Sequence, residues 1–203
     1  MRLAILSSTL ILILLAVNQA LAYDQVYGSP DYCWAGKMSS WGNSAYTIWH
    51  RAGELGLAAY TAVLGGIHLR GWMHRDLKWT DLSGPATARF DFGLCAEVFV
   101  GTPYAAARIV VTGFLRDVDS ATYVIKKTLY TYAGYTSGYH LIIDGKVVNQ
   151  PFEVVQGHRY TIGYTVDVYA TCYPRSMCPT ASVNMGEQGC SFWWQPTGIF
   201  AGW

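Results

Sequence analysis

The sequence predicts an all-β protein, a single antiparallel β-sandwich of jelly-roll-like form. Long runs in which apolar and polar residues alternate predict strands, and turn residues separate these runs. An amino terminus typical of exported proteins predicts that cysteines pair as disulfides. We expect the sandwich over 57–203. The segment before it, 23–56, is expected to be irregular and held by a disulfide, and it could include one short helix.

The first 22 residues have the layout of a secretory signal peptide. Arg2 precedes an apolar run over 3–17, and residues 20–22, Ala-Leu-Ala, have the form that signal peptidases cut. The alternative is a membrane anchor, but a spanning helix needs roughly 20 apolar residues, and this run ends at Asn18. We therefore expect a secreted or cell-surface protein whose mature chain, 23–203, is one domain without a transmembrane helix.

Composition narrows the classes of partner. The chain has 14 Lys and Arg against 13 Asp and Glu, and Arg2 lies in the predicted leader, so the mature chain is formally neutral. Neutrality argues against binding to nucleic acid, which needs a basic face. Aromatic residues reach 15% of the chain, with eight Trp and fifteen Tyr. This much ring surface predicts either exposed contact sites or a large aromatic core with hydroxyl groups at its rim.

The amino-terminal part has an ambiguous pattern. Apolar residues over 44–64 recur at helical spacing, but Gly53 and Gly56 each weaken a helix by roughly 1 kcal/mol. We favour a strand over 57–64 that continues into 67–78, and a short helix over 44–54 stays open. Six residues of 67–78 share one face at a period of two, namely His68, Arg70, Trp72, His74, Asp76 and Lys78. This face is either a ligand site with Trp72 as its platform or a solvated edge of the sheet.

Further strands follow, separated by turns. They are expected over 86–100, 108–116, 121–133, 139–143, 146–148, 151–155 and 158–172. Asp144-Gly145 is the strongest hairpin signal in the chain, because Asp-Gly supplies the positive φ angles of a two-residue turn. Pro151 places its segment at a sheet edge. The strand over 158–172 alternates strictly, with Cys172 near the end of its apolar face.

The cysteines form an odd set of five: Cys33, Cys95, Cys172, Cys178 and Cys190. Their spacing does not match the close pairs of a zinc site, and no C-x-x-C redox motif is present, so disulfides are predicted with one thiol left over. We expect Cys172 to pair with Cys178 or Cys190. Cys95 lies on the polar face of its strand, where it either reaches Cys33 or is the spare thiol. The sequence does not select among the pairings.

Residues that suggest metal binding or catalysis are few. Asp117 and Asp119 form an Asp-x-Asp in a predicted loop, the oxygen donors that calcium prefers, although two carboxylates alone are too few. The alternative is a plain polar turn, and no other cofactor is expected. Asp91 and Glu97 lie about 20 Å apart along one strand, too far for a glycosidase pair. No nucleophile motif such as G-x-S-x-G occurs, which favours a non-catalytic protein. A Ser-His-Asp triad assembled across the fold stays open, since geometry rather than order in the chain defines it.

Aromatic residues provide the functional hypothesis. Tyr130, Tyr132, Tyr135 and Tyr139 cluster in the sequence and, together with Trp72, form a predicted aromatic platform. Rings with polar tips suit contact surfaces that tolerate water. The aromatic tail, 191–203, either packs on its own domain or docks on a neighbouring copy. The favoured function is a non-catalytic extracellular module that binds glycans or cell-surface ligands; the alternatives are a self-assembling subunit of a surface layer or filament, and a secreted hydrolase.

Overall fold

The computed structural model describes residues 29–80, 82–101, 104–173, 179–186 and 190–201. Every regular element in these residues is a strand, which confirms the all-β class. No helix able to cross a bilayer occurs in this part of the chain. The predicted leader, the predicted turn residues 102–103, Cys178 and Trp203 lie outside the described residues.

Ten strands form one antiparallel sheet, which folds over on itself. In chain order they are β1 (Tyr32–Arg51), β2 (Glu54–Lys78), β3 (Gly84–Val100), β4 (Ala105–Asp117), β5 (Thr122–Gly134), β6 (Gly138–Val154), β7 (Arg159–Cys172), β8 (Thr180–Met185), β9 (Phe192–Trp194) and β10 (Gly198–Ala201). The predicted strands over 86–100, 108–116, 121–133 and 158–172 correspond to β3, β4, β5 and β7 and are confirmed.

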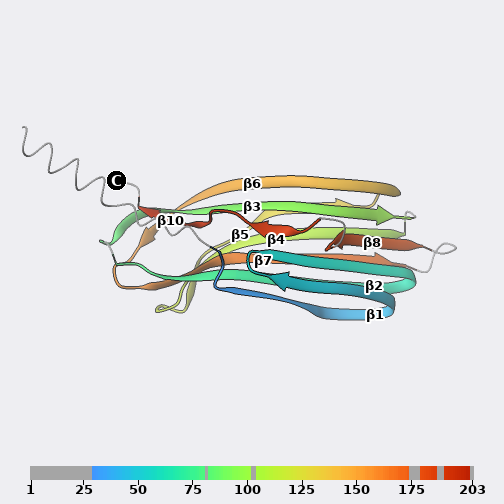
Figure 1. Cartoon of the computed structure of the whole chain (residues 1–203), viewed down its shortest axis with the longest axis horizontal. Coiled ribbons are helices and arrows are strands. Elements are labelled where there is room, and N and C mark those ends of the chain that lie inside the picture. Colours follow the sequence, from blue (N-terminus) through green and yellow to red (C-terminus); the bar gives the residue numbers. More distant parts are fainter. Residues whose placement is uncertain (1–28, 81, 102–103, 174–178, 187–189, 202–203) are drawn as a thin grey trace, which may run out of the picture.

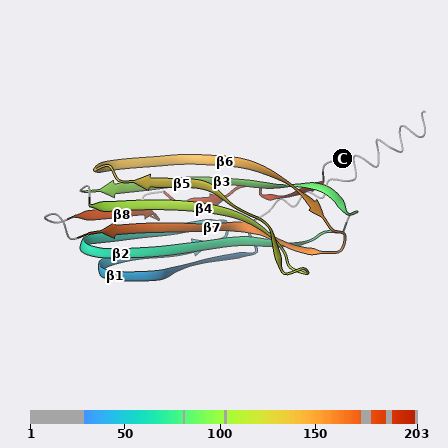
Figure 2. The same ribbon diagram turned by 180° about the vertical axis from the view of Figure 1, so that it is seen from behind.

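Strand β2 belongs to both layers of the resulting sandwich. Its first part, 54–62, pairs with β8 and β9, whereas its second part, 65–78, pairs with β7. The first layer therefore has the order β1–β2–β8–β3–β6, with β9 and β10 also beside β3, and the second layer has the order β1–β2–β7–β4–β5. Figure 1 looks onto the first layer and Figure 2 onto the second. Without β1 and the short strands β9 and β10, each layer has four strands, as in the jelly-roll-like sandwich that the sequence predicted.

β1 and β2 fold over together at a corner that joins the two layers. Gly42 and Gly65 face each other there, and a Cβ atom on Gly42 would lie 2.1 Å from the carbonyl oxygen of Leu64. Val63 has a φ of 62°, which a β-branched residue rarely adopts. Its N–H donates to the carbonyl of Pro179 at 2.7 Å, and this long-range bond holds the strained residue in place.

The amino-terminal segment is the first correction. Its described part, 29–56, is mostly strand rather than irregular, Cys33 is a free thiol, and 44–54 is not helical, because β1 pairs with β2 along nearly its whole length. Gly56, which argues against a helix in the sequence, lies under an aromatic ring, because Trp49 is its cross-strand partner and covers the space that a side chain there would occupy. Gly53 has a φ of 80° and lies in the turn between β1 and β2. The favoured strand over 57–64, continuing to 78, is confirmed as β2.

The predicted hairpin at Asp144-Gly145 is the second correction. Both residues lie in the middle of the straight strand β6, where Gly145 faces Gly93 of β3. The pairing with β3 extends from Gly138 to Val154, so a whole ladder of backbone hydrogen bonds replaces those of a local turn. Pro151 lies in this same strand at the edge of the first layer, as its segment was expected to.

The core lies between the two layers and is rich in aromatic rings. Tyr164 of β7 meets Phe92 of β3 with ring centroids 5.6 Å apart, and Phe192 of β9 stacks on Phe92 at 5.4 Å. The Tyr164 hydroxyl donates to the carbonyl of Asp91 at 3.0 Å, which satisfies the one polar group of that ring. Because β9 and β10 pair with β3, the tail over 192–201 packs on its own chain.

One disulfide, between Cys95 and Cys190, is present in the described residues. It replaces the expected pairings, since Cys33 and Cys172 are free thiols. The Cys95 N–H donates to the carbonyl of Ser191 at 2.9 Å, so the segment before β9 runs beside β3 and brings the two sulfur atoms together. Cys172 points into the core instead, where burial raises the pKa of its thiol. Burial also raises the pKa of Cys33, to about 11.

Candidate functional site

A band of aromatic rings crosses the outer face of the second layer. Trp34 of β1 lies directly opposite Trp72 of β2. The Trp72 ring contacts Phe114 of β4 edge-on, with centroids 5.9 Å apart, and Phe114 contacts Tyr123 of β5 at 6.1 Å. We call this band the aromatic belt; its members are Tyr32, Trp34, Trp72, His74, Phe114 and Tyr123.

The belt spans the full width of the layer. His74 bridges two of its rings, at 5.0 Å from Tyr32 and 5.9 Å from Trp72. The members come from β1, β2, β4 and β5, and β7 lies between β2 and β4. With neighbouring strands about 4.8 Å apart, five strands measure roughly 19 Å from the first to the last. The belt is therefore longer than one sugar-sized ring.

A glycine on β7 leaves room for the belt. In the strand register Gly163 lies between His74 and Phe114, so no side chain separates these two positions. A Cβ atom on Gly163 would lie 2.3 Å from the carbonyl oxygen of Met73, which makes any other residue costly there. The rings on either side of Gly163 are therefore free to approach each other.

The belt residues differ in exposure in a way that suits binding. Trp34 and Trp72 are 36% and 38% exposed, and Tyr32 and Tyr123 are also exposed, whereas Phe114 is buried. The Trp34 ring lies over Gly36, since a Cβ on that glycine would lie 2.4 Å from the indole. Trp34 and Trp72 thus keep part of their ring surface open to a ligand.

A charged cluster lies beside the belt on the same face. The buried carboxylate of Asp167 on β7 contacts two neighbours on β2: Nε2 of His68 lies 2.6 Å from Oδ1, and Nε of Arg70 donates to the same oxygen at 2.8 Å. Tyr169 stacks on the His68 ring, with centroids 4.1 Å apart. The hydrogen bond from Arg70 to Asp167 raises the pKa of the guanidinium, so it stays charged. We call His68, Arg70 and Asp167 the charged cluster.

The structure separates the five residues of the predicted platform. Trp72 lies on the outer face of the second layer, within the belt. Tyr130 and Tyr132 face buried residues of β4 and lie on the opposite, inward side of that layer. Tyr139 lies on the outer face of the first layer, and the exposed Tyr135 lies between β5 and β6. Nearness in sequence therefore did not predict nearness in space for these tyrosines.

The polar strand over 67–78 is not a sheet edge. It lies between β1 and β7, and its six alternating residues are on the outer face of the second layer. The sequence pattern identified Trp72, His68 and Arg70 there, but it did not identify Trp34 or Asp167, which arrive from other strands. Asp167 had a visible signal, because it is a charged residue on the polar face of the strictly alternating strand 158–172.

Asp117 and Asp119 form a turn rather than a calcium site. Asp117 accepts hydrogen bonds from the N–H groups of Asp119 and Ser120 at 3.0 and 3.2 Å, and its second oxygen contacts His158 at 2.8 Å. Asp119 accepts from the backbone and the guanidinium of Arg159. All four carboxylate oxygens are already bonded to donors, and no group of three ligating side chains occurs among the residues that the structure describes. The calcium prediction is therefore corrected to the polar turn.

This turn predicts a pH dependence of stability. Burial by itself raises the pKa of Asp117, but hydrogen bonds from His158 and Ser120 outweigh it and hold the pKa below its usual range. A carboxylate whose pKa is lower in the folded than in the unfolded chain stabilises the fold when the pH is above the unfolded pKa, about 4. This stability is lost as the pH falls through the lower pKa of the folded state. We expect Asp117→Asn to cost about 1.5 kcal/mol at pH 7 and to flatten the loss of stability below pH 4, measured by urea unfolding across pH.

Asp76→Asn is the matched control for this prediction, because the Asp76 side chain is mostly exposed. It should leave the pH profile of unfolding unchanged. A steep acid loss that persists in Asp117→Asn would show that another carboxylate is responsible.

Three residues on the outer face have the side-chain types of a catalytic triad. Ser39 lies opposite His68 in the β1–β2 register, and His68 contacts Asp167. However, none of the hydrogen bonds between described residues joins Ser39 to His68, and Arg70 shares the carboxylate that would orient the histidine. The triad geometry of nucleophile, base and orienting acid is therefore incomplete in the part of the chain that the structure describes.

Comparisons with known proteins provide no family for the chain. No family model and no curated protein matches it. Among solved structures, an isomalto-dextranase of Arthrobacter globiformis T6 complexed with panose matches 74% of this chain and 23% of its own at 10% identity and a TM-score of 0.25. Carbohydrate-binding modules of the β-sandwich superfamily match 75% of this chain and 54% of theirs, at 11% identity and a TM-score of 0.20.

A viral protein also matches. The structure of the infectious bursal disease virus Gx strain covers 85% of this chain and 45% of its own at 11% identity, with a TM-score of 0.24. The chain spans from about a quarter to just over half of the length of these three matches. At such TM-scores the matches say nothing about what the chain binds, and its function has to be inferred from its own surface.

Proposed function

We propose that this chain is a non-catalytic, extracellular module that binds a glycan chain across the aromatic belt. The observation that carries the proposal is the pair Trp34 and Trp72, which lie opposite each other with open ring surface beside the charged cluster. The disulfide between Cys95 and Cys190 supports an extracellular location, where thiols are oxidised.

The chemistry of the face suits a sugar. A pyranose ring has an apolar C–H face that packs on an indole and hydroxyl groups at its rim that need hydrogen bonds. Trp34 and Trp72 supply the apolar surface, while Arg70 supplies donors beside them. Because Asp167 already holds Arg70 and His68 in place, little side-chain entropy is lost when they bind a ligand.

The length of the belt points to a chain of sugars rather than a single one. A monosaccharide would contact only part of the roughly 19 Å that five strands span. Tyr32 on β1 and Tyr123 on β5 add exposed ring surface at the two edges of the belt. We therefore expect affinity to rise with the length of the oligosaccharide until the belt is covered.

The proposal predicts that Trp72→Ala weakens glycan binding about 10- to 100-fold. Covering one large apolar side chain is worth about 1.5–3 kcal/mol, and 1.4 kcal/mol is a factor of ten in affinity. The measurement begins with a glycan array and a panel of soluble polysaccharides, followed by calorimetric titration of the best binder with the wild-type chain and the variant.

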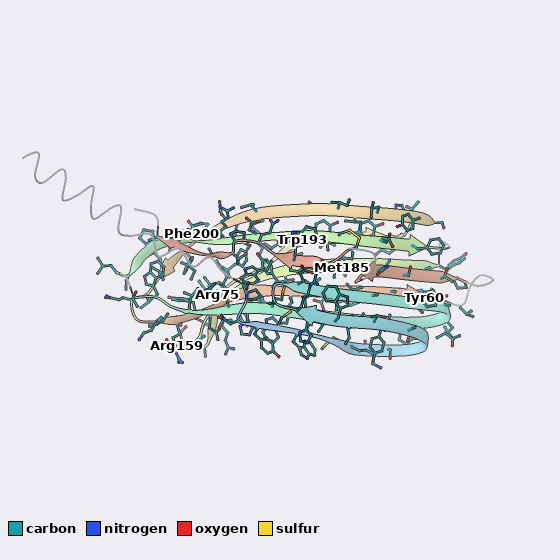
Figure 3. The ribbon with its side chains drawn as sticks, in the orientation of Figure 1. Tyr60, Arg75, Arg159, Met185, Trp193 and Phe200 are labelled. Atoms are coloured by element: carbon teal, nitrogen blue, oxygen red, sulfur yellow. A yellow bond between two sulfur atoms is a disulfide. The ribbon has the colours of Figure 1, made fainter. Side chains whose placement is uncertain are left out.

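Tyr60→Ala is the matched control. Tyr60 is an equally exposed aromatic residue, but it lies on the outer face of the first layer near the corner of β2 (Figure 3). Its replacement should leave glycan affinity unchanged. Equal affinity of Trp72→Ala and the wild-type chain, or a wild-type chain that binds none of the polysaccharides, would contradict the proposal.

A further inference from the structure

Strand β6 forms an unpaired edge of the first layer. Among the described strands it pairs only with β3, and no element lies beyond it in Figure 1 or Figure 2. The N–H of Cys95 on β3 points away from β6, because it donates to Ser191. Its partner Ile143 therefore directs its own N–H and carbonyl groups outward, to the free edge.

Every second residue of β6 has the same orientation as Ile143. Leu141, Gly145, Val147 and Asn149 thus also direct their backbone groups to the free edge. The N–H of Gly145 agrees with this orientation, because it donates to the side chain of the adjacent Asp144 at 2.7 Å rather than to β3. Pro151 is also one of these alternate residues. It has no N–H group, but an N–H at this position would point to the free edge, so no hydrogen bond to β3 is lost. The free edge therefore offers a row of acceptors and donors, in which the N–H of Gly145 is already bonded by Asp144 and Pro151 supplies a carbonyl alone.

The side chains on this edge are unusually apolar. Leu141, Ile143 and Val147 are 56%, 73% and 53% exposed, and all three are on the outer face of the first layer. Soluble proteins usually protect such an edge with charges, proline or a covering segment. A long edge strand with exposed aliphatic side chains is therefore suited to pairing with another strand.

The sequence of β6 is complementary to itself about Gly145. Residues at equal distance on either side have matching character: Asp144 and Lys146 are opposite charges, and Ile143 and Val147 are both aliphatic, as are Ile142 and Val148. The same symmetry makes the segment resemble a hairpin, but the structure extends it as one strand, so the complementarity is unused within the chain. It is satisfied when a second copy runs antiparallel to the first.

We propose that two copies of this chain pair through β6, antiparallel, about a two-fold axis at Gly145. In this register Asp144 faces the partner's Lys146, and Ile143 faces the partner's Val147. The contact is isologous, so each pair occurs twice. Gly145 meets the partner's Gly145 on the axis, where the absence of side chains lets the backbones approach. The two first layers become one continuous sheet.

The charges of β6 select this register. Asp144 and Lys146 are on the inner face of the strand, and in the single chain Lys146 donates to the carbonyl of Leu129 at 3.0 Å. A shift of two residues along the strand would remove both charge pairs, and a one-residue shift would put aliphatic side chains on the wrong face. The pattern therefore favours a closed dimer over an open array of strands.

The dimer also affects how the belts are presented. A two-fold axis in an antiparallel sheet is perpendicular to that sheet, so both second layers lie on the same side of it. Both aromatic belts would then face one polysaccharide surface, and two linked sites bind more tightly than either alone. This consequence rests on the proposed function, whereas the pairing of β6 does not.

The test is the molar mass of the full mature chain, measured by sedimentation over a range of concentrations without glycan. The wild-type chain is expected to form a dimer that dissociates on dilution. Asp144→Lys puts two lysines opposite each other twice in the dimer, and Lys146→Asp does the same with aspartates. Each variant is expected to weaken dimerisation at least 100-fold, because like charges facing each other across an interface cost several kcal/mol.

Mixing the two variants tests the register itself. In the mixture, residue 144 of each chain faces an opposite charge at residue 146 of the other, so a heterodimer is expected at the wild-type affinity. Lys78→Asp is the control and should dimerise normally, because Lys78 lies in the second layer opposite Arg159 and is not part of the β6 edge. A monomeric wild-type chain, single variants that still dimerise, or a mixture that stays monomeric would overturn the proposal. Glycan binding by a monomeric chain would leave the proposed function intact.

Discussion

Replacing Cys95 and Cys190 together with serine is expected to lower the free energy of unfolding by roughly 4 to 5 kcal/mol. The disulfide joins residues 95 positions apart in sequence. Closing so long a loop removes much of the conformational freedom of the unfolded chain, and the chain-entropy model gives about 4.7 kcal/mol for a loop of about 100 residues. The measurement is urea unfolding of the oxidised wild-type chain and of the double variant.

The bond also fixes the position of a short strand. β9 is three residues long and lies between β2 and β3 just after Cys190, so the disulfide holds the entry to this strand against β3. Cys33→Ser is the control, because Cys33 is a free thiol, and its stability should stay within about 1 kcal/mol of the wild type. Adding a reductant should bring the wild-type chain to the stability of the double variant. Identical unfolding curves with and without the bond would contradict the prediction.

Phe192→Ala is expected to cost about 3 to 5 kcal/mol of stability. Phe192 is fully buried and fills the space between the layers, where it stacks on Phe92 and meets the Tyr164 ring edge-on at 5.4 Å. Truncating a buried ring removes its transfer free energy and leaves a cavity that the two layers cannot close. Urea unfolding followed by tryptophan fluorescence measures the change.

Trp193→Ala is the matched control for Phe192→Ala. Trp193 is the next residue on β9 but faces outward, with its ring over Gly93 on the first layer (Figure 3). Because it stays partly exposed, its loss should cost clearly less than the loss of Phe192. A larger effect at Trp193 than at Phe192 would mean that the outer face, rather than the core, holds β9 in place.

Local patterns succeeded where a strand has one buried and one exposed face. The strand 158–172 alternates strictly because β7 lies in the middle of a layer with the core on one side, and each residue of its apolar face from Tyr160 onward is buried. The pattern failed at β1, where edge position, two bulges and a corner interrupt the alternation. No window along the sequence contains the partner strand that makes such a segment regular.

The Asp144-Gly145 pair shows how a long-range partner overrides a turn signal. Asp-Gly favours a hairpin locally, but β3 offers 17 residues of backbone pairing to the extended strand. The cysteines follow the same logic. Cys95 is on the outer face of β3, as the polar face of its strand predicts, but its partner is decided by the path of the chain before β9.

The candidate site was only partly visible in the sequence. Trp72 and the polar face of its strand follow from a period of two, which any reader of the sequence can apply. Trp34, Phe114 and Asp167 join Trp72 only when three other strands are placed beside β2. Tyr130 and Tyr132 were misplaced because they were grouped with Tyr139 by nearness in sequence, whereas they face the core from β5 and Tyr139 belongs to the other layer.

By itself the sequence determined the all-β class, that cysteines form a disulfide, and which residues of the strand over 67–78 lie on the same face as Trp72. These follow from alternation and composition, which depend only on neighbouring residues. The tertiary structure decided which strands meet, and with that the Cys95–Cys190 bond, the aromatic belt and the free edge of β6. The physical reason is that in an antiparallel sandwich each strand takes its hydrogen bonds and side-chain neighbours from segments remote in sequence.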